Sequence, residues 1–279
     1  MPGYIRPIDS TATQHDGTEG LVINDDFARR WLSLVALRIA APFSRQIYYP
    51  CVPISKHLII KSGPFAHLTE ASTLSYLAKN TSLPVPRVHC AFIHKNQAVI
   101  VMERIQGISV AKASASWSDA DRAAIFEQLR SMFQELRSLS PPDAAISSCI
   151  GGSLCDSRIP RSWPRFGPFK TTQDFHRWLR HGLRPEDHPE RTNDQDWKDI
   201  KDMATKQDGP WPPPVFTHGD LNPTNILVRG NRYPHYWEYT SVWYWARMWP
   251  WWQDYIAKFL DPHPEELAME ITRQKWWGE

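Results

Sequence analysis

Two side chains suited to group-transfer chemistry lie five residues apart in a polar loop. Asp220 and Asn225 belong to the stretch 215–228, in which an apolar start leads into polar residues and then into a second apolar run. This pattern predicts a buried strand, a turn and a second short strand. A carboxylate in the turn can accept a proton from a hydroxyl group, and an amide oxygen can bind a magnesium ion. We take residues 216–228 as a candidate catalytic loop.

Phosphoryl transfer, one chemistry that would use such a loop, also needs a cation against the phosphates and a carboxylate that holds this cation. Lys61 follows the apolar run Leu58–Ile60 in an expected strand at 56–63, and Glu70 lies in an expected helix at 65–80. A Lys–Glu pair alone is weak evidence, because such pairs are usually solvated on the surface. Its weight comes from the order of the parts, since a strand with Lys and a helix with Glu precede the loop.

The elements that must position these residues change in character along the chain. The first part reads as a helix at 25–40, the strand and helix just described, a turn at 83–88 that enters a strand, and a buried strand at 98–103 closed by Gly107. We expect Asn24 or Asp25 to cap the first helix. Its apolar residues at helical spacing are expected on one face: Phe27, Trp31, Leu34, Val35 and Ile39.

The second part is mainly helical. A helix is expected at 118–139, where Ser118 and Asp121 resemble a capping box. Further helices are expected at 172–183, 236–260 and 264–277. The expected helix at 236–260 is rich in tryptophan: Trp237, Trp243, Trp245, Trp249, Trp251 and Trp252. We interpret these residues as helix packing, with an aromatic wall for a cationic acceptor or an exposed patch as the alternatives.

Composition excludes several classes of protein. The 279 residues carry a net charge of +2, and no basic run is long enough to suggest a nucleic-acid partner. No stretch is apolar over the length that spans a bilayer, so we expect no membrane segment. Residues 1–20 read as a polar tail without a signal core, and the four cysteines lack zinc-type spacing. We expect a cytoplasmic protein; the sequence leaves its oligomeric state open.

The chain resembles the aminoglycoside phosphotransferase and choline kinase superfamily, the small-molecule branch of the protein-kinase-like fold. The main signature is HGDLNPTN, residues 218–225, a specific motif. Weaker matches occur in the same order along the chain: Ile59-Ile60-Lys61, Glu70, Val85-Pro86, Val101-Met102-Glu103 and Gly107. The resemblance covers about 45–265 and implies a two-lobed α+β fold. The N-terminal lobe would span 21–104 and the mainly helical C-terminal lobe 105–279.

The resemblance also implies a role for each site residue. Lys61 would contact the phosphates of ATP, and Glu70 would hold Lys61. Asp220 would act as the base that orients the acceptor hydroxyl, and Asn225 would bind Mg²⁺. His218 would brace the loop. The residues beside the adenine would be those of the hinge: Met102, Glu103 and Ile105.

One departure from the family pattern concerns the metal. The family has a strand pair after the Asn that ends in an Asp, its principal magnesium ligand. In this chain 226–228 is followed by RGNRYPHYWEY, which contains no Asp. The metal-binding strand is therefore expected to be deleted, by evolution or by a gene-model or splicing loss. Glu238 and Asp254 are the two candidate substitutes. A second departure is the stretch 41–53, which lacks a glycine where the family has its nucleotide-covering turn.

Two functions remain open at this point. The first is an ATP- and Mg²⁺-dependent phosphotransferase that acts on a small-molecule hydroxyl and is impaired by the lost ligand. The second is a catalytically inactive protein, of pseudokinase type, that binds a nucleotide or a partner. A third interpretation, in which His218 and Asp220 bind the metal of a hydrolase, lacks a supporting cluster of ligands.

Overall fold

The computed structural model describes residues 15, 17–43, 51–63, 66–141, 143–156, 165–187, 194–219, 221–229, 232–237, 256 and 258–277, and only the backbone of 232–237. The chain divides into two compact units. One comprises Ala12–Leu139 and Phe216–Leu260, and the other includes Ser140–Val215 and Asp261–Glu279. The lobe boundaries expected from the sequence remain a prediction. No helix in the described part of the chain has the length and apolarity needed to cross a membrane.

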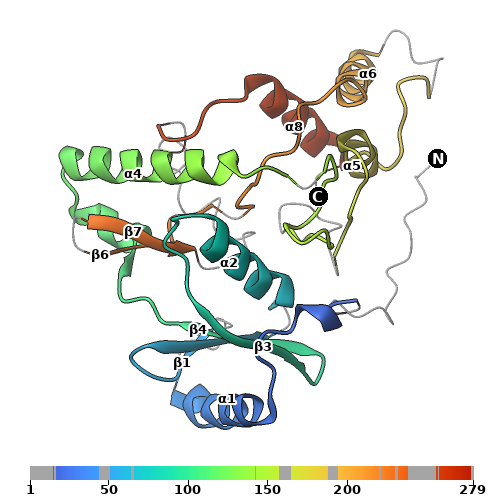
Figure 1. Ribbon diagram of the computed structural model, residues 1–279. Helices are drawn as coiled ribbons and strands as arrows, with labels where there is room; N and C mark the ends of the chain where they lie inside the picture. The colour runs from blue at the N-terminus through green and yellow to red at the C-terminus, as the bar shows by residue number, and fades with distance from the viewer. Residues whose placement is uncertain are drawn as a thin grey trace. The chain divides into compact units, whose positions relative to one another are not determined.

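A four-stranded antiparallel sheet organises the first unit (Figure 1). Its strands are β1 (Cys51–Pro53), β2 (Leu58–Gly63), β3 (Val88–His94) and β4 (Gln97–Glu103), in the order β1-β2-β4-β3. Lys95 and Asn96 join β3 to β4 with φ values of 49° and 57°. Two successive positive φ angles are typical of the tight hairpin turn that fits the twist of antiparallel strands. This short turn fixes the register that sets His94 opposite Gln97.

Both faces of this sheet are covered by helices. Helix α2 (Leu68–Asn80) buries Leu68, Ala71, Leu74 and Leu77 in the larger core, which includes Ala98, Ile100 and Met102 of β4. Helix α1 (Phe27–Ala40) packs Leu34, Ala36 and Leu37 against the other core, formed by Ile60, Cys90, Phe92, Val99 and Val101. The alternation of Ile100 with Val99 and Val101 between the two cores follows from the two-residue period of a strand.

Helix α1 corrects two expectations. Its N-cap is Asp26, whose side chain accepts a hydrogen bond from the Arg29 backbone N–H, rather than Asn24 or Asp25. The expected apolar face is also not the buried one, because Phe27, Trp31 and Ile39 are 84%, 55% and 62% exposed. The stripe that packs against the sheet consists of Leu34, Ala36 and Leu37. Of these, only Leu34 belongs to the expected face.

A second, three-stranded sheet in the same unit carries the candidate catalytic loop. Its strands are β5 (Ile108–Ser109), β6 (Ile226–Arg229) and β7 (Arg232–Trp237), in that order and antiparallel. The strand after the loop was expected, whereas Tyr236 and Trp237 were expected in a helix and lie in β7 instead. Residues 215–217 form no strand, and Val215 is 53% exposed.

Helices complete this unit. Short helix α3 (Val110–Ala113) leads through the 3-10 turn η3 (Ser114–Ser116) to α4 (Asp119–Ser138). The expected capping box is confirmed, with Ser118 accepting from the Asp121 N–H and Asp121 accepting from the Ser118 N–H. Helix α4 buries Ile125, Phe126, Leu129, Phe133 and Leu136 in the larger core, and Phe259 stacks on two of its rings. Two other 3-10 turns are η1 (Glu19–Leu21) and η2 (Ala41–Phe43).

The second unit contains α5 (Thr172–Leu179), α6 (Gln195–Gln207) and α8 (Pro264–Trp277). The last was expected over the same residues, whereas α6 was not expected. Four aromatic rings pack together around α5, with the rings of Phe166 and Trp178 stacked 5.0 Å apart: Phe166, Phe169, Phe175 and Trp178.

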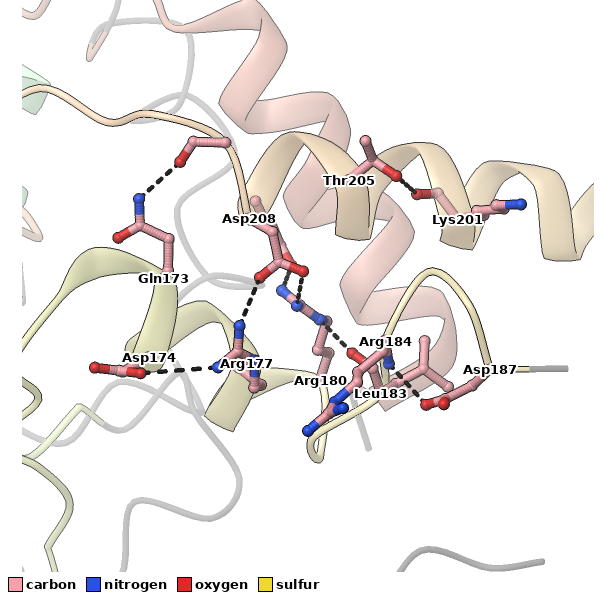
Figure 2. A network of polar contacts seen from close by, with 12 residues as sticks. Gln173, Asp174, Arg177, Arg180, Leu183, Arg184, Asp187, Lys201, Thr205 and Asp208 are labelled. Atoms are coloured by element: carbon pink, nitrogen blue, oxygen red, sulfur yellow. Dashed lines mark hydrogen bonds and ion pairs between the residues drawn. The ribbon is translucent and has the colours of Figure 1, made fainter.

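A buried arginine joins α5 to α6 (Figure 2). Arg180 is fully buried and donates to Asp208 Oδ2 at 2.5 Å, to Gln207 Oε1 at 3.2 Å and to the Leu183 carbonyl at 2.6 Å. Arg177 reaches the other carboxylate oxygen of Asp208 at 3.4 Å. Because an unpaired buried charge is costly, this carboxylate fixes the end of α6 on α5.

His176 lies next to this network. Burial lowers the pKa of His176 from 6.5 to about 4, and the positive charge of Arg180 acts in the same direction. Its ring lies 4.7 Å from that of Trp211. The imidazole is therefore neutral in the folded protein at neutral pH.

We expect Asp208→Asn to lower the free energy of unfolding by about 3 kcal/mol, because Arg180 would lose the carboxylate that compensates its buried charge. Thermal unfolding measured by circular dichroism would show the loss. The matched control is Asp202→Asn, whose carboxylate pairs with Lys206 on the exposed side of α6 and should leave the midpoint unchanged. Equal midpoints for both variants would contradict a stabilising role of Asp208.

The depressed pKa of His176 predicts a pH dependence of stability. The unfolded chain binds a proton at this site below pH 6.5 and the folded chain only near pH 4, so its contribution is complete above 6.5 and is lost as the pH falls toward 4. The loss amounts to at most about 3 kcal/mol. Unfolding midpoints across this range should fall less steeply for His176→Gln than for the parent. The exposed His57→Gln should keep the parent's slope.

Candidate functional site

The ion pair expected between β2 and α2 is present and buried. Lys61 Nζ lies 2.9 Å from Glu70 Oε1, and the two side chains are only 2% and 13% exposed. Lys61 follows Ile60, which points into the α1 side of the sheet, so the strand period turns Lys61 toward α2. This is the opposite of the solvated pair that such residues usually form on a surface. An ammonium group in this position needs a permanent anionic partner, and α2 supplies it.

Helix α2 is fixed where it presents Glu70. His67 is its N-cap, and the Nδ1 atom of this histidine accepts from the Thr69 backbone N–H at 3.1 Å. The ring of His15 stacks on that of His67 at a distance of 5.3 Å. Glu70 also lies in the first turn, where a carboxylate interacts favourably with the helix dipole. His67 was not predicted from the sequence, because histidine is an uncommon N-cap residue.

The hinge residues follow the end of β4. Met102 is buried and pairs with Ile59 of β2, and Glu103 pairs with Leu58. The Glu103 backbone N–H donates to the Arg87 carbonyl at 2.9 Å, and Arg104 donates to the His57 carbonyl at 2.7 Å. Within the described part of the chain, the backbone N–H and C=O of Ile105 make no hydrogen bond. A half-buried backbone edge with an available donor and acceptor suits the planar, hydrogen-bonding edge of a nucleobase.

The hinge is tied directly to the loop strand. Gly107 lies so close to β6 that a Cβ atom would meet the Val228 carbonyl oxygen at 3.0 Å. Arg229 Nε donates to the Gln106 carbonyl at 3.0 Å, and Ser109 of β5 pairs with Leu227. A side chain at position 107 would force these backbones apart. The glycine noted in the sequence therefore permits the hinge and the loop strand to meet.

The loop holds Asn225 in a fully buried position. The Asn225 N–H donates to the Asn222 carbonyl at 3.1 Å, and the Thr224 N–H donates to the Asn222 side-chain oxygen at 2.9 Å. The Thr224 hydroxyl also bonds that oxygen and lies 3.4 Å from Asn225 Oδ1. The Ala111 N–H donates to the Pro223 carbonyl at 2.9 Å, so α3 supports the turn. Asn222 and Thr224 were not predicted, although a short polar side chain beside Pro223 is a turn signal.

Asp220, the predicted base, lies outside the described residues, and its neighbours define the backbone on either side. Gly219 has φ of 76°, in the left-handed region where a residue with a Cβ atom is strained. His218 is half-buried, as is Leu221. The ring of Phe216 stacks on that of Tyr76 of α2 with the planes 1° apart, which anchors the start of the loop on the helix that carries Glu70.

Metal ligands are only partly accounted for. Across the described ranges, no group of three or more His, Cys, Asp and Glu side chains could hold an ion. The described loop offers the amide oxygen of Asn225. Mg²⁺ prefers carboxylate and phosphate oxygens and keeps some of its water, so one amide is compatible with the ion but insufficient for it. The carboxylates named from the sequence lie outside the described residues: Asp220, Glu238 and Asp254.

The structure thus brings Lys61 and Glu70 into contact and joins the hinge of Met102, Glu103 and Ile105 to the strand that follows Asn225. All of these elements belong to the first compact unit. Strand β5 was not predicted from the sequence, because a strand of two residues has no recognisable pattern. Gly107, which precedes it, was the one nearby residue that the sequence had marked.

Comparisons with known proteins agree with this arrangement. A search of curated proteins found no match. The model of a family described as the phosphotransferase enzyme family, APH, matches residues 66–234, more than half of the chain. The matched range includes Glu70, the hinge residues, Asp220 and Asn225, and leaves out Lys61 and the two candidate substitutes Glu238 and Asp254. The antiparallel four-stranded sheet and its helices are those of a mixed α+β, kinase-like two-lobed fold. The chain belongs to the phosphotransferase enzyme family, APH.

Proposed function

We propose that this phosphotransferase transfers the terminal phosphoryl group of ATP to a hydroxyl group of a small molecule. The observation that carries the proposal is the buried Lys61–Glu70 ion pair, 2.9 Å long, in the same compact unit as the loop of Asn225. A lysine that is held by a carboxylate and shielded from water interacts strongly with phosphate, because the dielectric response of water is excluded.

Each part of the site has a distinct task in this proposal. Lys61 neutralises charge on the nucleotide phosphates, and Glu70 fixes the direction of its ammonium group. The backbone of Ile105 bonds the adenine edge. Asp220 orients the acceptor hydroxyl and accepts its proton as the oxygen–phosphorus bond forms. When bound, Mg²⁺ neutralises charge on the phosphate oxygens, and Asn225 is the described residue suited to hold it.

The end of β7 lies close in the strand register to Asn225, where a second metal ligand is needed. Trp237 pairs with Ile226, the residue that directly follows Asn225, so the hairpin returns the chain to the level of this amide. Glu238 is the next residue along the chain and lies outside the described residues. From this chain position we propose that Glu238, rather than Asp254, supplies the missing carboxylate.

The nucleotide role of Lys61 predicts a selective loss of binding. Saturating ATP with Mg²⁺ should raise the unfolding midpoint of the parent protein, since a ligand at about a hundred times its Kd adds about 2.7 kcal/mol. We expect Lys61→Met to lose most of this shift. The exposed Lys56→Met, in the bend that precedes β2, should retain it. Differential scanning calorimetry with and without nucleotide makes the comparison, and equal shifts in both variants would exclude Lys61 from the nucleotide site.

The assignment of Glu238 predicts a metal-specific defect. Glu238→Gln should weaken binding of Mn²⁺ in the presence of a non-hydrolysable ATP analogue by at least tenfold, about 1.4 kcal/mol, whereas Asp254→Asn should not. Electron paramagnetic resonance of free Mn²⁺ measures both. The reverse result would assign the ligand to Asp254.

Turnover is tested by measuring ADP release over a panel of hydroxyl acceptors. We expect the parent protein to release ADP and Asp220→Ala to release none. A nucleotide-induced midpoint shift without turnover in the parent would favour the inactive binding protein.

A further inference from the structure

Helix α1 carries an apolar ridge that the described residues of this chain leave largely exposed. The residues of the ridge follow at intervals of four: Phe27, Trp31, Val35, Ile39 and, in η2, Phe43. Four of them are strongly exposed, at 84%, 55%, 62% and 83% for Phe27, Trp31, Ile39 and Phe43. Leu32 beside them is 59% exposed. Helix α1 lies against one face of the four-stranded sheet (Figure 1). It packs there through a different stripe, which contains Leu34 and Leu37.

The exposed area is large for a surface of a monomer. Aromatic side chains present roughly 150–250 Å² each, so the exposed parts of Phe27, Trp31 and Phe43 amount to about 300–550 Å² before Leu32 and Ile39 are added. Single exposed apolar residues are ordinary, but a continuous patch of this size marks an interaction site. A stable interface of standard size needs about 800 Å² from each partner, so the ridge can supply a modest one.

The arrangement of the ridge suits a second copy of the same helix. Rows of residues at intervals of four interdigitate in the commonest class of helix packing, with the axes crossing at about −50°. The order along the ridge is nearly symmetric about Val35, with a phenylalanine at each end. A twofold axis through Val35 would set Phe27 against Phe43 of a second copy and Trp31 against Ile39. Isologous contacts of this kind are the usual basis of homodimers.

The charges on α1 favour the same occupant over a membrane surface. Arg29 pairs with Asp26 at 2.5 Å and Arg30 with Asp25 at 2.7 Å, which leaves Arg38 at the other end. A helix that lies on an anionic membrane carries a row of basic residues, and here two of three arginines are neutralised. Antiparallel pairing of two copies opposes their helix dipoles, and the internal ion pairs Asp26–Arg29 and Asp25–Arg30 leave little net charge to repel a second copy. We propose that the protein forms a homodimer through antiparallel α1 helices.

The dimer predicts a concentration-dependent mass. Sedimentation velocity of the full chain should show the mass rising from 32.3 kDa toward twice that value over the micromolar range. Ile39→Lys should remain monomeric, because it places a charge in the ridge. The matched control is Ile271→Lys on α8, an isoleucine of nearly equal exposure, 60% against 62%, which should dimerise like the parent. Circular dichroism confirms that both variants are folded.

The register has its own test. Val35→Cys should form a covalent dimer on mild oxidation, because position 35 would lie at the twofold axis. Phe43→Cys should not exceed the parent, since its two copies would be about 24 Å apart along the helices. A parent that stays monomeric throughout, or Val35→Cys and Phe43→Cys linking equally, would overturn the proposal. So would sedimentation of a monomer with vesicles of phosphatidylcholine and phosphatidylserine that Ile39→Lys abolishes, which would assign the ridge to a membrane surface.

Discussion

The burial of one ammonium group constrains much of the first unit. Lys61 lies inside the layer between β2 and α2, where an uncompensated charge would cost several kcal/mol. The Glu70 carboxylate lies 2.9 Å from the Lys61 ammonium group. To keep this contact, α2 must hold a fixed rotation about its axis and a fixed position along it relative to β2. The N-cap at His67 fixes where the helix begins. Its rotation is fixed by the buried stripe of Leu68, Ala71, Leu74 and Leu77. The ion pair and the packing of the core thus require the same position of α2.

The second constraint acts between backbones. The segment at Gly107 lies so close to β6, the strand after the candidate catalytic loop, that a Cβ atom at position 107 would meet the Val228 carbonyl oxygen at 3.0 Å. The bonds from Arg229 to Gln106 and from Ala111 to Pro223 reinforce this contact. A nucleobase at Ile105 and an ion at Asn225 would therefore be positioned by adjacent segments of one small sheet. Segments more than a hundred residues apart in the sequence are thereby held next to each other.

Sequence patterns predicted those elements whose local signals agree with their surroundings. Helices α4 and α8, strand β4 and the strand after the loop were confirmed, because capping residues, apolar periodicity and turn chemistry all indicated the same state. The pairing of Lys61 with Glu70 was predicted in position but not in burial, which depends on the packing of a helix nine residues away. Helix α1 was confirmed as a helix, but its buried face was predicted wrongly. Periodicity identifies apolar residues at helical spacing, and the sheet packs on the stripe with Leu34, Ala36 and Leu37. Strand β5 is too short to have a signal of its own.

The three-stranded sheet also limits what a longer version of this chain could look like. Strand β6 has two edges; β5 occupies one and β7 the other. If a transcript restored the strand that family members carry after the Asn, that strand would need the edge on which Arg232–Trp237 now lies. Both cannot pair with β6 at once. The two products would then differ by an exchange of strands beside β6, with Arg232–Trp237 released from the sheet in the longer one, rather than by a simple addition at the surface.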